Sequence, residues 1–167
     1  KHYPGEKDRV THAEGLMVGY RHYDAAGLEP AYPFGFGLSY TTFGHGAPEL
    51  VSAGPVGPDN PARVAVTVRN TGSRSGREVV QCYLEFVDPP DGRPPRQLVD
   101  FAKVEIQPGA TATVQFEIPF REFLTFNVDA WEWVRESGDF RIACGPHSRQ
   151  LQSTEIGVDD PVATLLP

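Results

Sequence analysis

The sequence is short of positive charge, of cysteine and of long apolar runs. Its 167 residues include 15 lysines and arginines against 22 aspartates and glutamates, which gives a formal net charge of -7 at pH 7. Because nucleic acids and anionic membrane surfaces are bound through basic faces, this balance argues against both as partners. No apolar run approaches the roughly 20 residues that a membrane-spanning helix needs. The first residues, Lys1 to Gly5, also lack the charged-then-apolar order of a signal peptide.

Two cysteines are too few for a disulfide framework. Cys82 lies between Val80 and Leu84 in an alternating apolar pattern, and Cys144 follows Ile142 in another. Both positions are expected to point inward, where a free cysteine behaves as a small hydrophobic side chain. We therefore predict two buried free thiols, with a disulfide between adjacent strands as the alternative.

The sequence also contains no phosphate-binding loop, dinucleotide fingerprint, nucleophile elbow or zinc-ligand spacing. No cofactor and no metal site are therefore expected. His2, His12 and His22 recur every ten residues, an interval that puts side chains on no common face of a helix or strand. Since zinc ligands normally come as a close pair plus others, we interpret these histidines as solvated loop residues rather than metal ligands.

Proline and glycine, in contrast, are plentiful, with 16 and 17 residues respectively. This composition favours many short strands and turns over long helices. Residues 63–69 alternate valine with small or polar residues, which is the period-two pattern of a strand covered on one face. The length and the 40% hydrophobic content suit one domain with an attached segment.

The same alternation recurs along the rest of the chain. Strands are predicted at residues 49–53, 63–69, 78–87, 98–106, 112–118, 130–135, 139–144 and 150–156, with a helical turn at 119–123. The residues expected to point inward include Val80, Cys82, Leu84, Phe86, Ala112, Val114, Phe116 and Ile118. Short strands with turns at intervals of roughly 8–12 residues predict a mainly β fold of the sandwich type. We interpret the proline-rich stretch 89–95 as a stiff hairpin connection rather than as a proline-rich ligand.

Residues 14–43 are too rich in aromatic residues, glycine and proline for an ordinary helix or strand. The prolines restrict φ and the glycines permit turns, so we expect a rigid, irregular segment. Tyr32, Phe34, Phe36 and Tyr40 recur at even spacing and point to one side in an extended chain. We expect the apolar cover for these rings to come from polypeptide outside the 167 residues.

Motifs in this segment and beyond it occur in the order and spacing of one family. They are Glu14-Gly15, Gly19-Tyr20-Arg21, Tyr23-Asp24, Pro33-Phe34-Gly35 with Gly37-Leu38-Ser39-Tyr40-Thr41, Arg69-Asn70-Thr71-Gly72, Gly76 with Glu78-Val79-Val80-Gln81 and Tyr83, Gly138-Asp139-Phe140, and Cys144-Gly145 with Ser148-Arg149. Nearly the whole chain resembles the part of family 3 glycoside hydrolases where the α/β sandwich domain ends and a fibronectin type III-like domain follows. The β-glucosidases of the family resemble it most.

The resemblance implies a mainly β fold, with a fibronectin type III-like (immunoglobulin-like) β-sandwich preceded by an irregular segment that ends an α/β sandwich domain. The implied boundaries are residues 1–43 for that end and its linker arm, 44–158 for the fibronectin type III-like domain, and 159–167 for a tail.

The resemblance also implies an activity for the whole enzyme, the hydrolysis of terminal non-reducing β-D-glucosyl residues with retention of configuration. In the family, an Asp nucleophile comes from a barrel domain and a Glu acid/base from the sandwich domain, both upstream of the residues present here. No catalytic residue is therefore expected in this chain, and the segment alone is expected to be inactive. Its implied partner is the N-terminal catalytic part of the same enzyme, and it meets the β-glucoside substrate only through that enzyme, with loops that border the aglycone side of the cleft. The same part of a β-xylosidase is the alternative within the family.

Seven residues are expected to pack the domains together, namely Arg21, Tyr23, Asp24, Tyr32, Phe34, Phe36 and Tyr40. Glu14, Arg21 and Asp24 can form an ionic cluster. Because the family's catalytic carboxylates lie elsewhere, we interpret Arg21 as pairing with the two carboxylates to hold the irregular segment in place.

Trp131 and Trp133 share one face of the predicted strand 130–135, and with Tyr83 they could form a platform on which sugar rings stack. Large aromatic residues also dominate cores and interfaces, so we favour packing on a neighbouring domain or on the strand's own sheet. The alternative from a different functional class is a freestanding carbohydrate- or protein-binding module. The two tryptophans favour that alternative, and the aromatic segment before residue 43 counts against it.

Overall fold

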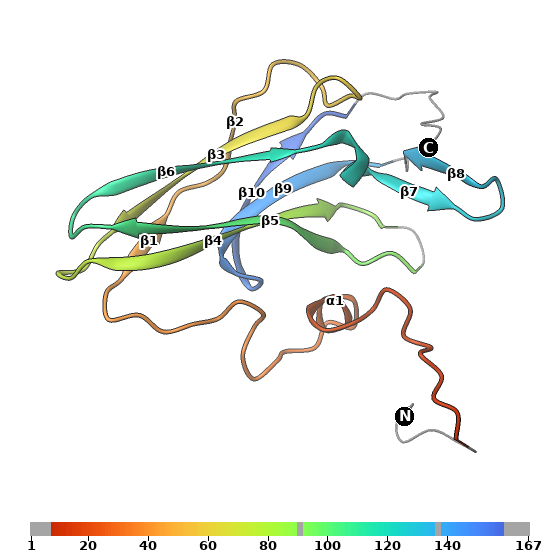
Figure 1. The fold of residues 1–167 in the computed structure, drawn as a ribbon, viewed down its shortest axis with the longest axis horizontal. Helices are drawn as coiled ribbons and strands as arrows, with labels where there is room; N and C mark the ends of the chain where they lie inside the picture. The colour runs from red at the N-terminus through yellow and green to blue at the C-terminus, as the bar shows by residue number, and fades with distance from the viewer. Residues whose placement is uncertain (1–7, 90–91, 136–137, 159–167) are drawn as a thin grey trace.

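The structure, a computed structural model, describes residues 8–89, 92–135 and 138–158 and consists mostly of short strands (Figure 1). Its elements in chain order are α1 (Tyr20–Ala25), β1 (Phe43–His45), β2 (Glu49–Leu50), β3 (Ala62–Asn70), β4 (Gly76–Phe86), β5 (Arg96–Ile106), β6 (Thr111–Ile118), the 3-10 helix η1 (Phe120–Phe123), β7 (Leu124–Asn127), β8 (Glu132–Arg135), β9 (Phe140–His147) and β10 (Gln150–Ile156).

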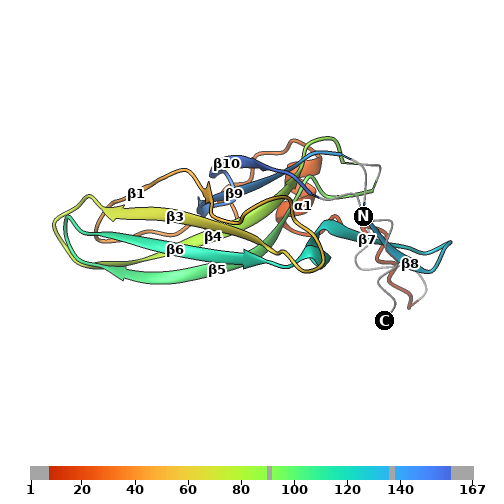
Figure 2. The ribbon, with the colours of Figure 1, turned by 90° about the horizontal axis from the view of Figure 1, so that it is seen from above.

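The strands form two antiparallel sheets and one separate hairpin. In the first sheet, β3 pairs with β6 along one edge and with β1 and β2 along the other. The second sheet has the order β10-β9-β4-β5. Strands β7 and β8 pair with each other and extend beyond one end of the sandwich (Figure 2). The predicted mainly β sandwich is therefore confirmed. The described residues of the stretch 89–95 lie in the connection between the paired strands β4 and β5, and residues 90–91 lie outside the described residues.

Alternating side chains from both sheets form one apolar core. Val64, Val66 and Val68 of β3 have no exposed surface. The predicted inward residues Val80, Cys82, Leu84, Phe86, Val114, Phe116 and Ile118 are all buried in the same cluster, and Ala112 packs against it. Fully burying a large apolar side chain contributes roughly 1.5–3 kcal/mol, so this set is the main stabilising term of the sandwich.

Cys82 on β4 and Cys144 on β9 lie directly opposite each other, and both are buried and free. The prediction of buried free thiols is confirmed. The pKa of the Cys82 thiol is raised, mainly by a hydrogen bond with Cys144 and secondly by burial. The thiol therefore stays protonated and unreactive at neutral pH.

Asn70, the last residue of β3, is a fully buried polar side chain whose amide is completely used. Its Nδ2 donates to the backbone oxygens of Arg74 at 2.7 Å and Ile106 at 2.8 Å. Its Oδ1 accepts from Thr41 Oγ1 at 2.8 Å and from the Gly72 N–H at 3.1 Å. A single side chain thus joins the end of the N-terminal segment to the β3–β4 turn and to the end of β5.

The structure departs from the predicted elements mainly in short strands. The region predicted as a strand at 49–53 contains only the two-residue strand β2, while the expected strand 139–144 continues to His147. The strands β1 and β7 were not predicted, because three or four residues are too few to show an alternation. The helical turn expected at 119–123 is the 3-10 helix η1. The predicted tail, residues 159–167, lies outside the described residues.

We use the term arm for residues 14–43, which run along one side of the sandwich (Figure 1). The expectation of a wholly irregular arm is wrong in one place, because Tyr20–Ala25 forms the helix α1. These six residues contain neither glycine nor proline, and Gly19 at φ 60° and Gly27 at φ 61° flank them. In the described part of the chain, no helix is long and apolar enough to cross a membrane.

The histidines of the N-terminal region do not gather. His12 is exposed, with its Nδ1 3.5 Å from Glu14, and His22 lies on α1 with its ring against that of Tyr23. His2 lies outside the described residues. Within the ranges that the structure describes, no three metal-ligating side chains come together.

Candidate functional site

The feature that distinguishes this sandwich is a strand covered on both faces. On β4, Val80, Cys82 and Leu84 point into the core, so the alternate residues Gln81 and Tyr83 point away from it. These outward residues are nevertheless buried, with exposed fractions of 6% for Gln81 and 0% for Tyr83. The arm provides their cover, and this contact between arm and sandwich is the candidate site.

Aromatic rings make the first part of the contact. The ring of Tyr20 at the start of α1 stacks on Phe34 with 5.0 Å between centroids, and it meets Tyr83 edge-on at 5.8 Å. The Leu98 N–H of β5 donates to the Tyr20 hydroxyl at 2.7 Å. The Tyr83 hydroxyl donates to Gln81 Oε1, and burial raises the pKa of Tyr83, with nearby Tyr20 acting in the same direction. Tyr83 is therefore a neutral hydrogen-bond donor at physiological pH.

A close backbone approach makes the second part. Gly35 has a φ of 87°, and a Cβ at this position would collide with the side-chain amide of Gln81. The neighbouring Phe34 carbonyl accepts a hydrogen bond from the Ser148 N–H at 3.0 Å. Glycine is required here both for the left-handed backbone and for the missing side chain.

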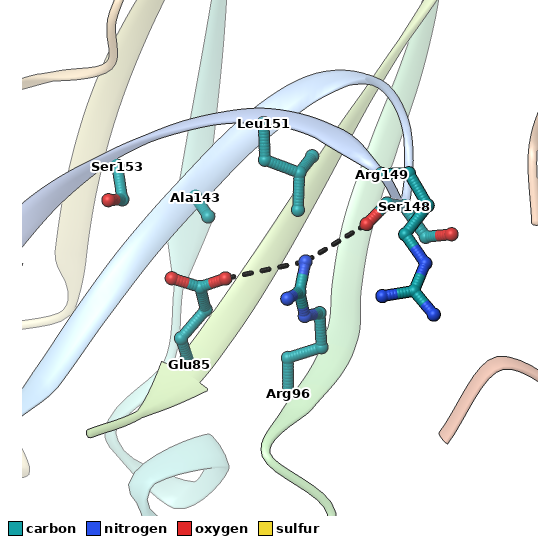
Figure 3. Close-up of a pocket in the computed structure, with 7 residues that line it drawn as sticks. All are labelled: Glu85, Arg96, Ala143, Ser148, Arg149, Leu151 and Ser153. Carbon is teal, nitrogen blue, oxygen red and sulfur yellow. Dashed lines mark hydrogen bonds and ion pairs between the residues drawn. The ribbon is translucent and has the colours of Figure 1, made fainter. Parts of the chain in front are cut away.

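An ionic network makes the third part. The Asp24 carboxylate, whose side chain is only 3% exposed, lies 3.3 Å from Arg96 Nε and 3.2 Å from Arg149 Nη1. Arg149 also donates to the Leu28 carbonyl at 2.7 Å. Arg96 Nη1 donates to the Ser148 carbonyl at 2.9 Å and lies 3.5 Å from Glu85 Oε1 (Figure 3).

This network corrects the ionic cluster expected from the sequence. Asp24 pairs with Arg96 and Arg149, whereas Arg21 places its guanidinium 6.0 Å from the centre of the Tyr20 ring. Asp24 thus joins the arm to β5 and to the β9–β10 turn, and Arg21 is not among its ion-pair partners. Since its carboxylate is buried between two guanidinium groups, it is not available as a nucleophile or base toward a sugar.

Cavities border the contact, and two of them share residues with the ionic network. One of about 270 Å³ lies under the β9–β10 turn and is lined by Glu85, Arg96, Ala143, Ser148, Arg149, Leu151 and Ser153 (Figure 3). Another of about 330 Å³ lies between α1 and the following loop, and Tyr23, Asp24, Tyr32 and Phe34 are among its lining residues. The second cavity therefore lies between arm and sandwich, because Ser148 and Arg149 also line it, whereas sandwich residues alone line the first.

The remaining aromatic residues of the arm do not all point to one side. Phe34 packs on Tyr20, whereas Tyr32 and Phe36 meet each other at 5.6 Å between centroids. The chain turns at this point, with the Phe36 N–H donating to the Pro33 carbonyl at 3.0 Å, so the extended geometry assumed for the even spacing does not hold. Tyr32 is 75% exposed, and Tyr40 is 93% exposed. The outer side of the arm thus presents uncovered apolar surface.

The alternative of a sugar-stacking platform is excluded for Trp131, Trp133 and Tyr83 as a group of three. Tyr83 is fully buried beneath Tyr20 in the second sheet. Trp133 lies on β8, and Trp131 lies in the turn before it rather than in the predicted strand. Both tryptophans contact Phe126 of β7 instead.

Sequence reasoning missed Gln81, Arg96, Ser148 and Arg149 as site residues. Polar residues that alternate with a core-facing series on a strand are expected at a solvated surface. Arg96 and Arg149 are far from Asp24 in sequence, so no local pattern connects them. The family motifs include Gln81 and Ser148-Arg149, and Gly35 permits a close backbone contact, but neither signal indicates which residues meet.

Comparisons with known proteins agree with this architecture. Residues 78–148 match the family described as the fibronectin type III-like domain. The chain is 42% identical over 149 residues to thermostable beta-glucosidase B of Acetivibrio thermocellus, an alignment that covers 89% of this chain and 20% of that protein. It is 40% identical over 165 residues to a beta-glucosidase of Rhizobium radiobacter, covering 99% of this chain and 19% of that protein.

Solved structures give the same result. The GH3 beta-glucosidase of Bifidobacterium adolescentis superposes with a TM-score of 0.86 at 33% identity, over 99% of this chain and 24% of that one. The beta-glucosidase DesR of Streptomyces venezuelae superposes with a TM-score of 0.84 at 34% identity, over 95% of this chain and 20% of that one. The chain therefore belongs to the family 3 glycoside hydrolases of β-glucosidase type, as a segment that carries their fibronectin type III-like domain and spans about one fifth of the relatives' length.

Proposed function

We propose that the chain is the C-terminal, non-catalytic part of a retaining β-glucosidase that hydrolyses terminal non-reducing β-D-glucosyl residues. The names of the relatives support the substrate class, because the similar proteins and structures are β-glucosidases. The greater length of the relatives supports a catalytic part outside this chain, since the chain corresponds to only about one fifth of their length.

The catalytic carboxylates are supplied by the rest of the enzyme. A retaining glycosidase needs two carboxyl groups about 5–5.5 Å apart on either side of the scissile bond. Asp24 does not meet this requirement, because its carboxylate is 3% exposed and engaged by two arginines. We assign it to holding the arm on the sandwich.

The function of the segment is to join domains. The arm is fixed on its inner side by Asp24, Tyr20 and Gly35, while its outer side carries Leu38 and Tyr40, each 93% exposed. This exposed apolar surface on an anchored arm is the observation that carries the proposal. Covering two large apolar side chains contributes several kcal/mol, at roughly 1.5–3 kcal/mol each. The proposed cover is the catalytic part of the same enzyme, with its barrel and α/β sandwich domains.

The test uses the full-length enzyme with Leu38 and Tyr40 both replaced by Ser. We expect a lower melting temperature and a lower kcat/KM on an aryl β-D-glucoside, because the catalytic part loses an apolar contact. Phe101→Ser on β5, which removes a 64% exposed aromatic residue outside the arm, is the matched control. Unchanged stability in the double variant contradicts the proposal, as does glycosidase turnover by the 167-residue chain alone.

The sugar specificity is tested separately. Aryl β-D-glucoside and aryl β-D-xyloside are compared on the full-length enzyme, and the glucoside is expected to have the higher kcat/KM. A higher value on the xyloside would support the same structural role in a β-xylosidase.

A further inference from the structure

The β7–β8 hairpin is an aromatic surface that the arm contact leaves unexplained. Phe126 of β7 lies opposite Trp133 of β8 in the strand register. The centre of the Phe126 ring is 5.5 Å from that of Trp133 and 5.2 Å from that of Trp131, in edge-to-face arrangements with interplanar angles of 66° and 80°. We call Phe126, Val128, Trp131 and Trp133 the hairpin patch.

The hairpin patch is largely uncovered. Val128 is 71%, Trp131 is 79% and Trp133 is 46% exposed. A hairpin of two strands is at best marginally stable in water unless its apolar face packs on something else. A contiguous exposed patch with two tryptophans is therefore typical of an interface.

The exposed residue Trp131 has a strained backbone conformation. Its φ of 56° lies in the left-handed region, which bulky side chains rarely occupy. The preceding turn is fixed by Asn127, whose Oδ1 accepts from the Asp129 and Ala130 N–H groups at 3.0 Å each. Such strain persists where surrounding contacts stabilise it, and it is concentrated at functional sites.

We propose that the hairpin patch is a second docking surface, occupied by the catalytic part of the enzyme's own polypeptide. This inference rests on the proposed function. Most of the polypeptide in the relatives lies outside the segment that this chain matches. The hairpin and residues 8–19 extend toward the same end of the long axis (Figures 1 and 2). Polypeptide joined to the arm on its N-terminal side would therefore lie near the hairpin.

The chemistry of the patch fits a protein surface better than a sugar chain. Sugar recognition combines a ring face with hydrogen-bonding groups beside it, and the Asn127 side-chain oxygen next to the patch is already used inside the turn. The edge-to-face arrangement around Phe126 forms a compact aromatic cluster, and Val128 extends it with aliphatic surface. An apolar pocket on the catalytic part is therefore the expected counterpart.

The test is hydroxyl-radical footprinting of the native full-length enzyme, read by mass spectrometry at single residues. The reference for intrinsic reactivity is a synthetic peptide of residues 124–135. If the patch is docked, Trp131 and Trp133 are oxidised about tenfold more slowly in the enzyme than in the peptide, as expected for the buried centre of an interface. Oxidation of Trp131 at the rate of the peptide would overturn the proposal.

Three comparisons separate this proposal from its competitors. The oxidation rates of Leu38 and Tyr40 are measured in the same sample. If these arm residues are protected while the hairpin is not, the hairpin proposal alone is overturned. If neither surface is protected, the proposed function is overturned as well. Protection of Trp131 that disappears on dilution assigns the surface to a second copy and overturns the proposal. Protection that appears only when a soluble β-glucan is added assigns it to carbohydrate, with the same consequence.

Discussion

Gly35 of the arm and Gln81 of β4 lie so close together that no side chain can be added at the glycine without displacing the glutamine amide. Gln81 is buried and its Oε1 accepts a hydrogen bond from the Tyr83 hydroxyl, so its side chain has little freedom to move.

Replacing Gly35 by Ala should therefore loosen the arm. The substitution adds a clash and places alanine at a φ of 87°, and we expect it to lower the free energy of unfolding by about 1–3 kcal/mol. Gly37→Ala is the matched control, because a Cβ at Gly37 meets no atom within 4 Å. Urea denaturation of both variants checks the difference. Equal stability of the two would show that the Gly35 contact is not restrictive.

The partners of Asp24 are tested by a pair of variants. Asp24→Asn removes the carboxylate charge with which Arg96 and Arg149 both form ion pairs. We expect this substitution to lower the free energy of unfolding by about 1–3 kcal/mol. Arg21→Gln should change the free energy of unfolding by less than about 0.5 kcal/mol, because Arg21 is not a partner of Asp24. Denaturant titration at constant ionic strength provides both values. A larger effect of the Arg21 substitution would restore the cluster expected from the sequence.

The buried Cys82 thiol makes the stability of the chain depend on alkaline pH. The pKa of Cys82 is raised in the folded state, so its contribution to stability is complete below the ordinary thiol pKa of about 8.5 and decreases as pH rises above it. The free energy of unfolding should fall by up to about 1.4 kcal/mol per pH unit between roughly pH 9 and pH 10. Urea titrations across this range measure the slope, and the Cys82→Ala variant should have a smaller one. A slope that does not change with this substitution would assign the effect to other groups.

Asn70 is expected to be among the most sensitive polar positions. Asn70→Ala leaves the Arg74 and Ile106 carbonyls and the Gly72 N–H without their partner, and we expect a loss of about 2–4 kcal/mol. Thr41→Val removes one of the four hydrogen bonds and should cost about 1 kcal/mol. Thermal unfolding of the two variants compares them. Similar melting temperatures would mean that the Thr41 bond accounts for the whole effect.

The sandwich could be predicted because its signal is local. The valines of β3 and the core series Val80, Cys82 and Leu84 follow a period of two, and that period is the geometry of a half-covered strand. The cover on the opposite face of β4 could not be predicted, because Gln81 and Tyr83 have the polar character of solvated strand residues. Their burial depends on Tyr20 and Gly35, which the fold alone brings to this strand.

The same limit applies to charge and to aromatic residues. The sequence predicts an ionic cluster of Asp24 with Arg21 and Glu14, but the arginines that pair with Asp24 come from β5 and the β9–β10 turn, which only the folded sheet places together. Trp131 and Trp133 were expected on one strand face, and the turn fixed by Asn127 places Trp131 outside the strand.

Because β4 is enclosed between the core and the arm, the arm is a mechanical link to the middle of the second sheet. Tension applied to the arm by a moving neighbouring domain would be transmitted through Tyr20 and Asp24 to Tyr83 and Arg96, rather than being absorbed by a loose tether. Cutting the chain at residue 43 to isolate the sandwich would leave the apolar ring of Tyr83 facing water, so the isolated sandwich is expected to be less stable than the sandwich with its arm.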